Sequence, residues 1–261
     1  MKTHFIRYLL ILLSLSFYIK AFSADNDQLI ETAIYTFGSF EYTVMTDREQ
    51  NNALTDSQMY SFHKYVLKHQ NVLLTQFNLS QPAKTRITIC NNSKIFESET
   101  GQKAQTATFY DRAKRVLFLQ EIRGLKEQNI LKQTIQHKML YLLLDTNRAL
   151  SVTPGLRVLE EAFCEYHFTK GRKPEVSTLP ESYTTFARHL YRAIEGDDAV
   201  KQEKAFALLN LWGAHLIKKI GAKAYLDILL KEREDKNELP QKHYDSFRKE
   251  YNETIANNGG I

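Results

Sequence analysis

Two hydrophobic patterns divide the chain into a mixed first part and a helical second part. Apolar and polar residues alternate in several short segments, as they do in β-strands with one buried face. Apolar residues at spacings of three and four predict helices, both between those strands and through the rest of the chain. We therefore predict an α+β fold in which a small mixed sheet lies N-terminal to a helical C-terminal half.

The same patterns place the individual elements. The predicted strands are 33–44 (a strand pair or one bulged strand, with a break at Gly38-Ser39), 85–90, 107–110 and 116–120. The predicted helices are 55–77 (with Tyr60 on its apolar side), 94–99, 127–144, 156–168, 181–195, 199–220, 222–231 and 241–256. Polar residues that commonly cap helices precede the first two of these helices, and a glycine follows the second. Residues 24–33 are polar and are expected to form a loose lead-in.

The first 23 residues predict a secretory signal peptide. Lys2 and Arg7 precede a short apolar run at 8–19, and Ala21-Phe22-Ser23 places small residues at a cleavage site. The run falls short of the ~20 apolar residues that span a bilayer, so no transmembrane span is expected after cleavage. We expect an exported protein, periplasmic or secreted, with one domain at 24–261. Its strand and helix part covers about 34–125 and its helical part 126–261.

Charge and cysteine content narrow the choice of partner and compartment. Removing residues 1–23 takes away Lys2, Arg7 and Lys20 and no acid, so the formal net charge falls by three, from +5 to +2. Such a balance gives no support for nucleic-acid binding. The two cysteines, Cys90 and Cys164, could form a disulfide in an exported protein or lie as two buried thiols. Both alternatives are open.

The candidate chemistry lies in two predicted helices within 131–166. His137 and Tyr141 are four residues apart on the first helix, and Glu161 and Glu165 are four apart on the second. Side chains at this spacing project from one face of a helix. A histidine and a glutamate are ligand types that zinc accepts.

Three other pieces, in their order around His137 and Glu161, resemble parts of the peptidase MA-like (gluzincin) metallopeptidase domains. They are 85–90 with 93–101, 108–111 with 115–119, and 205–231. The resemblance covers about 40–232. It implies that His137 and Glu161 face each other beneath an edge strand at about 116–120. In the family, the first helix carries His-Glu-x-x-His and the second carries a ligand glutamate and an orienting acid, which Glu161 and Glu165 match.

The chain departs from that pattern where catalysis needs it. Lys138 stands in the position of the general base and Tyr141 in that of the second histidine. We therefore expect no catalysis and no bound cofactor, and a degenerate domain that binds an unknown peptide or protein, such as a cell-envelope partner. The alternative is a divergent zinc-dependent peptidase or hydrolase that uses His137, Glu161 and a further ligand.

Ordinary structural roles are also open to these residues. His137 could pair with Glu161 or Glu165, and Lys138 could pair with an acid such as Glu160 or lie solvated. The remaining histidines after the signal peptide are expected to lie away from the site. Those expected on ordinary surfaces are His63, His69, His189, His215 and His243, and His167 is expected to point off the metal face.

The cleavage site generates a direct prediction. We expect the mature chain to begin within a few residues of Ala24, because Ala21-Phe22-Ser23 follows the apolar run. N-terminal sequencing of the exported protein measures this. Recovery of membrane-bound protein that still begins at Met1 would contradict it.

Overall fold

The computed structural model describes most of the chain as two compact units, residues 1–146 and 147–261. The described residues are 30–50, 53–103, 107–127, 129–148, 152–169, 178–196, 198–231 and 238–258. The predicted signal peptide at 1–23 lies outside them. Each unit is described by itself below.

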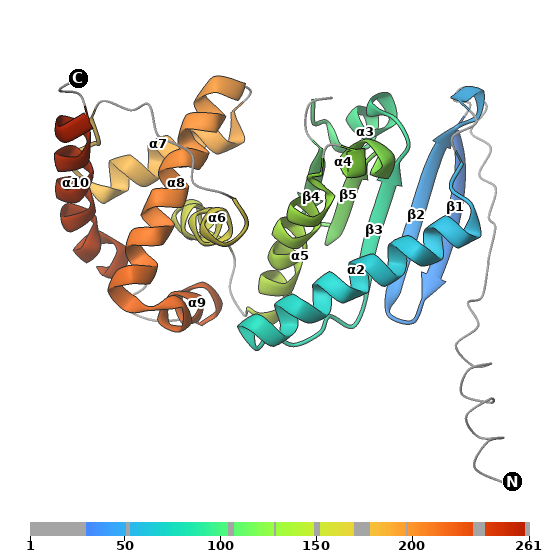
Figure 1. Cartoon of the computed structure of the whole chain (residues 1–261), viewed down its shortest axis with the longest axis horizontal. Coiled ribbons are helices and arrows are strands. Elements are labelled where there is room, and N and C mark those ends of the chain that lie inside the picture. The colour runs from blue at the N-terminus through green and yellow to red at the C-terminus, as the bar shows by residue number, and fades with distance from the viewer. Residues whose placement is uncertain are drawn as a thin grey trace, which may run out of the picture. The chain divides into compact units, whose positions relative to one another are not determined.

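The first unit contains a five-stranded mixed sheet in the order β1-β2-β3-β5-β4 (Figure 1). The strands are β1 (Ile30–Phe37), β2 (Phe40–Asp47), β3 (Thr85–Cys90), β4 (Thr108–Asp111) and β5 (Val116–Gln120). Antiparallel hairpins, β1–β2 and β4–β5, form the two ends, and β2–β3 and β3–β5 are parallel. This sheet, followed by a mostly helical second half, confirms the predicted α+β class.

One row of buried side chains crosses the sheet. Tyr42 is opposite Ile87, Ile87 is opposite Leu117, and Leu117 is opposite Tyr110. All four side chains are buried. The alternation that predicted the strands reflects this arrangement, because every second residue of each strand points into the same core.

The sheet order corrects two expectations. The strand expected at the edge, Val116–Gln120, lies inside the sheet, because β5 pairs with β3 on one side and with β4 on the other. The edge strand of this hairpin is β4. In addition, β1 begins at Ile30, within the segment expected to be a loose lead-in, because its pairing with β2 extends to Asp47.

The helices of this unit are α2 (Asp56–Phe77), α3 (Ser93–Thr100), α4 (Ile122–Glu127) and α5 (Leu131–Asn147), with a short 3-10 turn at Arg48–Gln50. Parallel neighbours need a crossover connection, and here α2 lies between β2 and β3 in the chain, while α3 and β4 lie between β3 and β5. Thr55 and Gln58 form a capping box at the start of α2, and Asn92 caps α3. The helix predicted at 127–144 is α5, which begins at Leu131 and ends at Asn147, and the short α4 that precedes it was not predicted.

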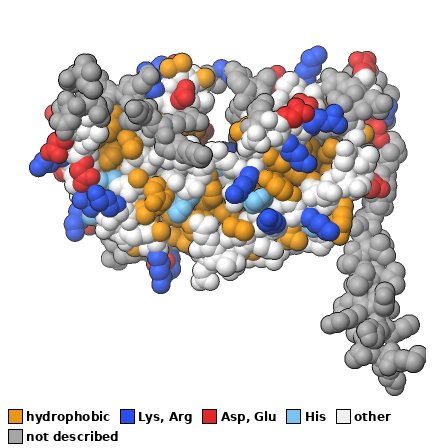
Figure 2. Space-filling model, in the orientation of Figure 1, with side chains coloured by type: hydrophobic (Ala, Val, Ile, Leu, Met, Phe, Trp, Pro, Cys, Tyr) orange, Lys and Arg blue, Asp and Glu red, His pale blue; other side chains and the backbone are white. Residues whose placement is uncertain are grey.

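The exposed face of α2 is basic and partly apolar. The prediction that Tyr60 lies on the apolar side of this helix is wrong. Half of its surface is exposed, and Lys64 Nζ lies 4.4 Å from its ring centroid. The only acidic residue of α2 is Asp56, at its first position. Figure 2 shows Lys, Arg and His side chains among hydrophobic ones along the face on which α2 lies in Figure 1.

The second unit is helical throughout its described residues. Its helices are α6 (Pro154–Phe168), α7 (Tyr183–Glu195), α8 (Ala199–Ile220), α9 (Ala222–Leu230) and α10 (Glu238–Asn258). Thr153, Ser182 and Asp198 cap α6, α7 and α8 with their side chains. A cluster of aromatic rings around the buried Trp212 joins α7, α8 and α10.

Helices α6 and α8 approach each other at a glycine. A Cβ atom placed on Gly213 would lie 2.2 Å from the carbonyl oxygen of Ala162, which is closer than real Cβ contacts allow. A glycine inside a helix costs about 1 kcal/mol relative to alanine. The close contact with α6 is what requires it here.

We expect Gly213→Ala to lower the free energy of unfolding by about 2–4 kcal/mol despite its better helix propensity, because the two helices must move apart. Urea unfolding followed by circular dichroism measures the change. Gly155→Ala is the matched control, because this glycine also lies in a helix, α6, and a Cβ there meets nothing within 4 Å. An equal stability of the Gly213→Ala variant and the parent would contradict the proposed close contact.

Three histidines predicted on the surface lie inside the units, so that prediction is wrong for them. His69 and His215 are 6% and 5% exposed, and the half-buried His63 stacks on Phe37 and bonds to the Tyr42 hydroxyl at 3.0 Å. The cause is tertiary packing. Histidine is counted as polar in a hydrophobic pattern, but the flat face of its ring can pack against apolar side chains, so the pattern does not predict its burial.

Burial sets the pH dependence of stability. It lowers the pKa of His63, His69 and His215, and it lowers the pKa of His167 from 6.5 to about 4. Each of these groups favours the neutral form in the folded state. Their contribution to stability is therefore present above the unfolded pKa of 6.5 and is lost as the pH falls toward the lower folded pKa.

We expect the free energy of unfolding to fall steadily from pH 6.5 to pH 4, and His167→Phe to remove roughly 1–2 kcal/mol of that fall. The expected effect is smaller than the full pKa shift because the His167 ring is partly exposed. Urea unfolding at pH 4, 5, 6.5 and 8 measures it. The comparison at pH 8, where the imidazole is neutral in both states, isolates the packing effect of the substitution. The same acid slope in parent and variant would rule out His167 as a source of it.

Candidate functional site

The predicted site residues belong to both units. His137, Lys138 and Tyr141 lie on α5 in the first unit, and Glu161 and Glu165 lie on α6 in the second. The predicted approach of His137 to Glu161 joins the two units and stays a prediction. We therefore describe two groups separately: the histidine group (His137, Lys138, Tyr141) and the glutamate group (Glu160, Glu161, Glu165).

A direct hydrogen bond defines the histidine group. His137 Nε2 lies 2.7 Å from the Tyr141 hydroxyl, and the two ring centroids are 5.1 Å apart. The four-residue spacing on α5 places both side chains on one face of the helix. Tyr141 is only 1% exposed. The residue that the resemblance aligns with a second ligand histidine is thus a buried phenol bonded to His137.

Two cations lie over the Tyr141 ring. Lys138 Nζ is 4.9 Å from its centroid, and the Arg112 guanidinium is 5.5 Å from it. These are cation–π distances, at which a positive charge is attracted to the face of an aromatic ring. The Tyr141 ring therefore contacts the Lys138 ammonium while its hydroxyl bonds to His137.

Arg112 and its neighbours were not singled out from the sequence. Tyr110 on β4 stacks on Tyr141 at 6.5 Å, Arg112 lies 5.8 Å from the Tyr110 ring, and Arg112 pairs with Asp145 on α5 at 2.5 Å. Burial and the neighbouring Asp145 carboxylate raise the pKa of the Tyr110 hydroxyl. Arg112 lies in the polar turn between β4 and β5. No short-range signal in the sequence indicates that a side chain of this turn contacts α5.

The glutamate group is a set of three buried carboxyl side chains on one helix. Glu160, Glu161 and Glu165 are 0%, 2% and 5% exposed. The helix that carries them begins at Pro154 after the N-cap Thr153, a combination that fixes its first turn. Buried carboxylates are costly unless they are paired and hydrogen-bonded, so their partners decide the character of this group.

Two arginines neutralise part of the glutamate group. Arg157 Nη2 lies 2.7 Å from Glu161 Oε1, four residues away on α6, and Arg148 Nη2 lies 3.1 Å from Glu160 Oε1. Arg157 also lies 3.8 Å from Glu160 and 3.6 Å from Glu195. Glu160, suggested by the sequence as a partner for Lys138, is therefore engaged by arginines. The four-residue spacing of Arg157 and Glu161 was the signal available for one of these pairs.

Within each unit, these side chains are engaged with protein partners. A catalytic zinc centre needs three nitrogen, sulfur or carboxylate ligands and one open position. Tyr141, which the resemblance aligns with a second ligand histidine, is a phenol bonded to His137, and Glu161, aligned with the third ligand, is bonded to a guanidinium. Lys138, aligned with the general base, carries an amine instead of a carboxylate.

Both cysteines are buried, one in each unit. Cys90 lies in β3, where burial raises its pKa to about 12, and Cys164 lies on α6. A thiol with so high a pKa is a poor nucleophile and metal ligand at neutral pH. A disulfide between them would join the two units. A disulfide and two separate thiols therefore both stay open as predictions.

Comparison of the chain with models of known protein families and with curated protein sequences finds no match in either case. Within the described residues, no helix has the length and apolar character needed to cross a lipid bilayer.

Proposed function

We propose that the chain is an exported, non-catalytic gluzincin-like domain, a pseudopeptidase, which binds a peptide or a cell-envelope partner through its former substrate surface. The observation that carries this proposal is the hydrogen bond of 2.7 Å between His137 and Tyr141, with Lys138 over the same ring. Tyr141 and Lys138, which stand at the ligand and base positions of the resemblance, are thus engaged with His137 and with each other rather than supplying a histidine ligand and a carboxylate base.

The chemistry of the base position supports the loss of catalysis. A general base must accept a proton at the working pH, and its removal typically lowers a rate by ~10²–10⁴-fold. The ammonium of Lys138 has no lone pair, so it cannot accept a proton. It also repels a metal dication beside it. The loss of a metal ligand at Tyr141 adds to this effect, because the metal supplies the nucleophilic water.

The charges around the histidine group support a binding role. Lys138 and Arg112 lie over Tyr141, and both cations come from elements of the first unit, α5 and the β4–β5 hairpin. Cations beside aromatic rings suit the carboxylates and apolar side chains that a peptide offers. A peptide partner therefore agrees with the side chains that replace the catalytic ones.

We expect the purified exported protein to contain substoichiometric zinc and to leave peptide substrates intact. Elemental analysis of protein prepared without added metal gives the zinc content, and incubation with a mixed peptide library gives the activity. One zinc per chain that is lost in His137→Ala would contradict the proposal and would favour the zinc-dependent hydrolase.

A gain-of-function variant tests whether the helices keep the geometry of a metal site. Lys138→Glu with Tyr141→His restores the base and the second histidine, and we expect it to raise zinc affinity at least tenfold. Lys138→Glu with Tyr141→Phe is the matched control, because it removes the same ammonium and phenol but adds no ligand. Equal zinc affinity of the two variants would contradict the gluzincin-like arrangement of α5 and α6.

A further inference from the structure

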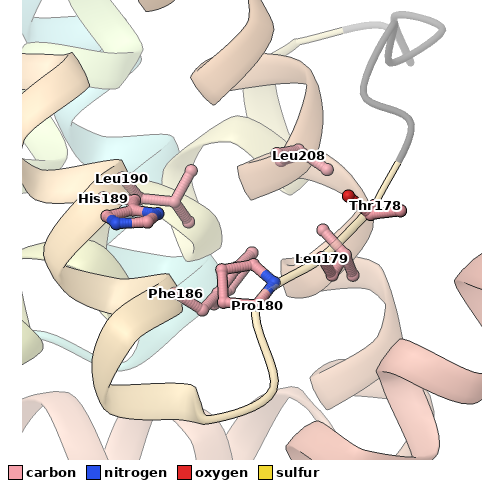
Figure 3. A pocket seen from close by; sticks show the side chains of 7 residues that line it. All are labelled: Thr178, Leu179, Pro180, Phe186, His189, Leu190 and Leu208. Carbon is pink, nitrogen blue, oxygen red and sulfur yellow. The ribbon is translucent and has the colours of Figure 1, made fainter.

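The second unit contains a pocket of about 390 Å³ beside α7 (Figure 3). Seven residues line it: Thr178, Leu179, Pro180, Phe186, His189, Leu190 and Leu208. They come from the segment that precedes α7, from α7 itself and from α8. None of them belongs to the histidine group or the glutamate group, so the pocket is independent of the proposed function.

The lining is apolar except at two places. Figure 3 shows leucine, proline and phenylalanine side chains around the space, with the His189 ring on one side and Thr178 on the other. Leu179, Phe186, Leu190 and Leu208 are buried, whereas His189 is exposed. Small-molecule sites have this composition, with a mainly apolar wall and a few polar groups that orient the ligand.

We propose that this pocket binds one medium-chain carboxylic acid, with its hydrocarbon chain among the leucines and its carboxylate on the His189 imidazole. At about 30 Å³ for each non-hydrogen atom, the volume accepts a molecule of roughly ten to thirteen such atoms. The lining contains one imidazole, which can donate a ring N–H to a carboxylate oxygen, and no acidic side chain that would repel an anion. Arg188 and Arg192, exposed on the same helix, add to the positive potential.

The only tryptophan of the chain offers a natural reporter for the pocket. Trp212 is fully buried and follows Leu208 by four residues on α8, so the two side chains share a helix face. Its ring lies 6.1 Å from that of Phe186, in a T-shaped arrangement. A ligand that displaces water from the pocket and contacts Phe186 changes the surroundings of the indole, and therefore its emission.

The test is a titration of the full-length exported protein with decanoate, followed by Trp212 fluorescence and by calorimetry. We expect saturable binding of one molecule per chain with a Kd between about 10 μM and 1 mM, a range that suits a ligand of this size. His189→Gln should weaken decanoate binding about tenfold and leave decanol binding unchanged. Arg188→Gln removes a charge from the neighbouring position outside the lining, and we expect it to change the Kd less than threefold.

Three results would overturn the inference. Absence of saturable decanoate binding would exclude the site, and equal affinity for decanoate and decanol in the parent would exclude recognition of the acid. The third concerns the location. Thr178→Trp fills the pocket from an exposed position, so it leaves the core intact, and undiminished binding to this variant by calorimetry would place the ligand elsewhere.

Discussion

The second unit depends on the contact of two helix backbones. Where α8 crosses α6, Gly213 leaves no room for a side chain against the Ala162 carbonyl. Two hydrogen bonds add to the hold on α6: Asn210 of α8 donates to the carbonyl of Glu165, and the Tyr225 hydroxyl of α9 donates to the carbonyl of Leu159, both at 2.8 Å. Because these bonds reach the backbone of α6, they fix the rotation of the helix as well as its distance. That rotation decides where the three buried carboxyl groups point.

Burial of those carboxyl groups in turn explains the arginines. A carboxylate loses its hydration inside a protein, and only a close opposite charge with hydrogen bonds offsets the loss. Arg148 is itself 2% exposed and serves Glu160, while Arg157 bridges Glu161, Glu160 and Glu195. At Glu161, the guanidinium of Arg157 supplies this opposite charge from one turn earlier on the same helix.

Local patterns predicted most elements of the fold and few of the contacts in the candidate site. Alternation found the strands because each has one buried face, and the caps at Thr55 and Asn92 found helix starts because they act within three residues. The edge position of β4 could not be predicted, since strand order depends on pairing between distant segments. The same holds for Arg112, whose partners Tyr141 and Asp145 lie on another element. His137 and Tyr141 were related by helical spacing, but their bond was not foreseen.

The mixed sheet has a consequence for how the chain folds. Parallel pairing joins Phe40 to Thr85 and Arg86 to Val116, so the sheet forms only after long loops have closed, which costs chain entropy before any contact repays it. The second unit meets the same constraint in helical form, because the bond that ties α8 to α6 joins Asn210 to Glu165, 45 residues apart. Each unit must therefore close a long loop before its core forms, so helix content alone does not make either unit a fast folder.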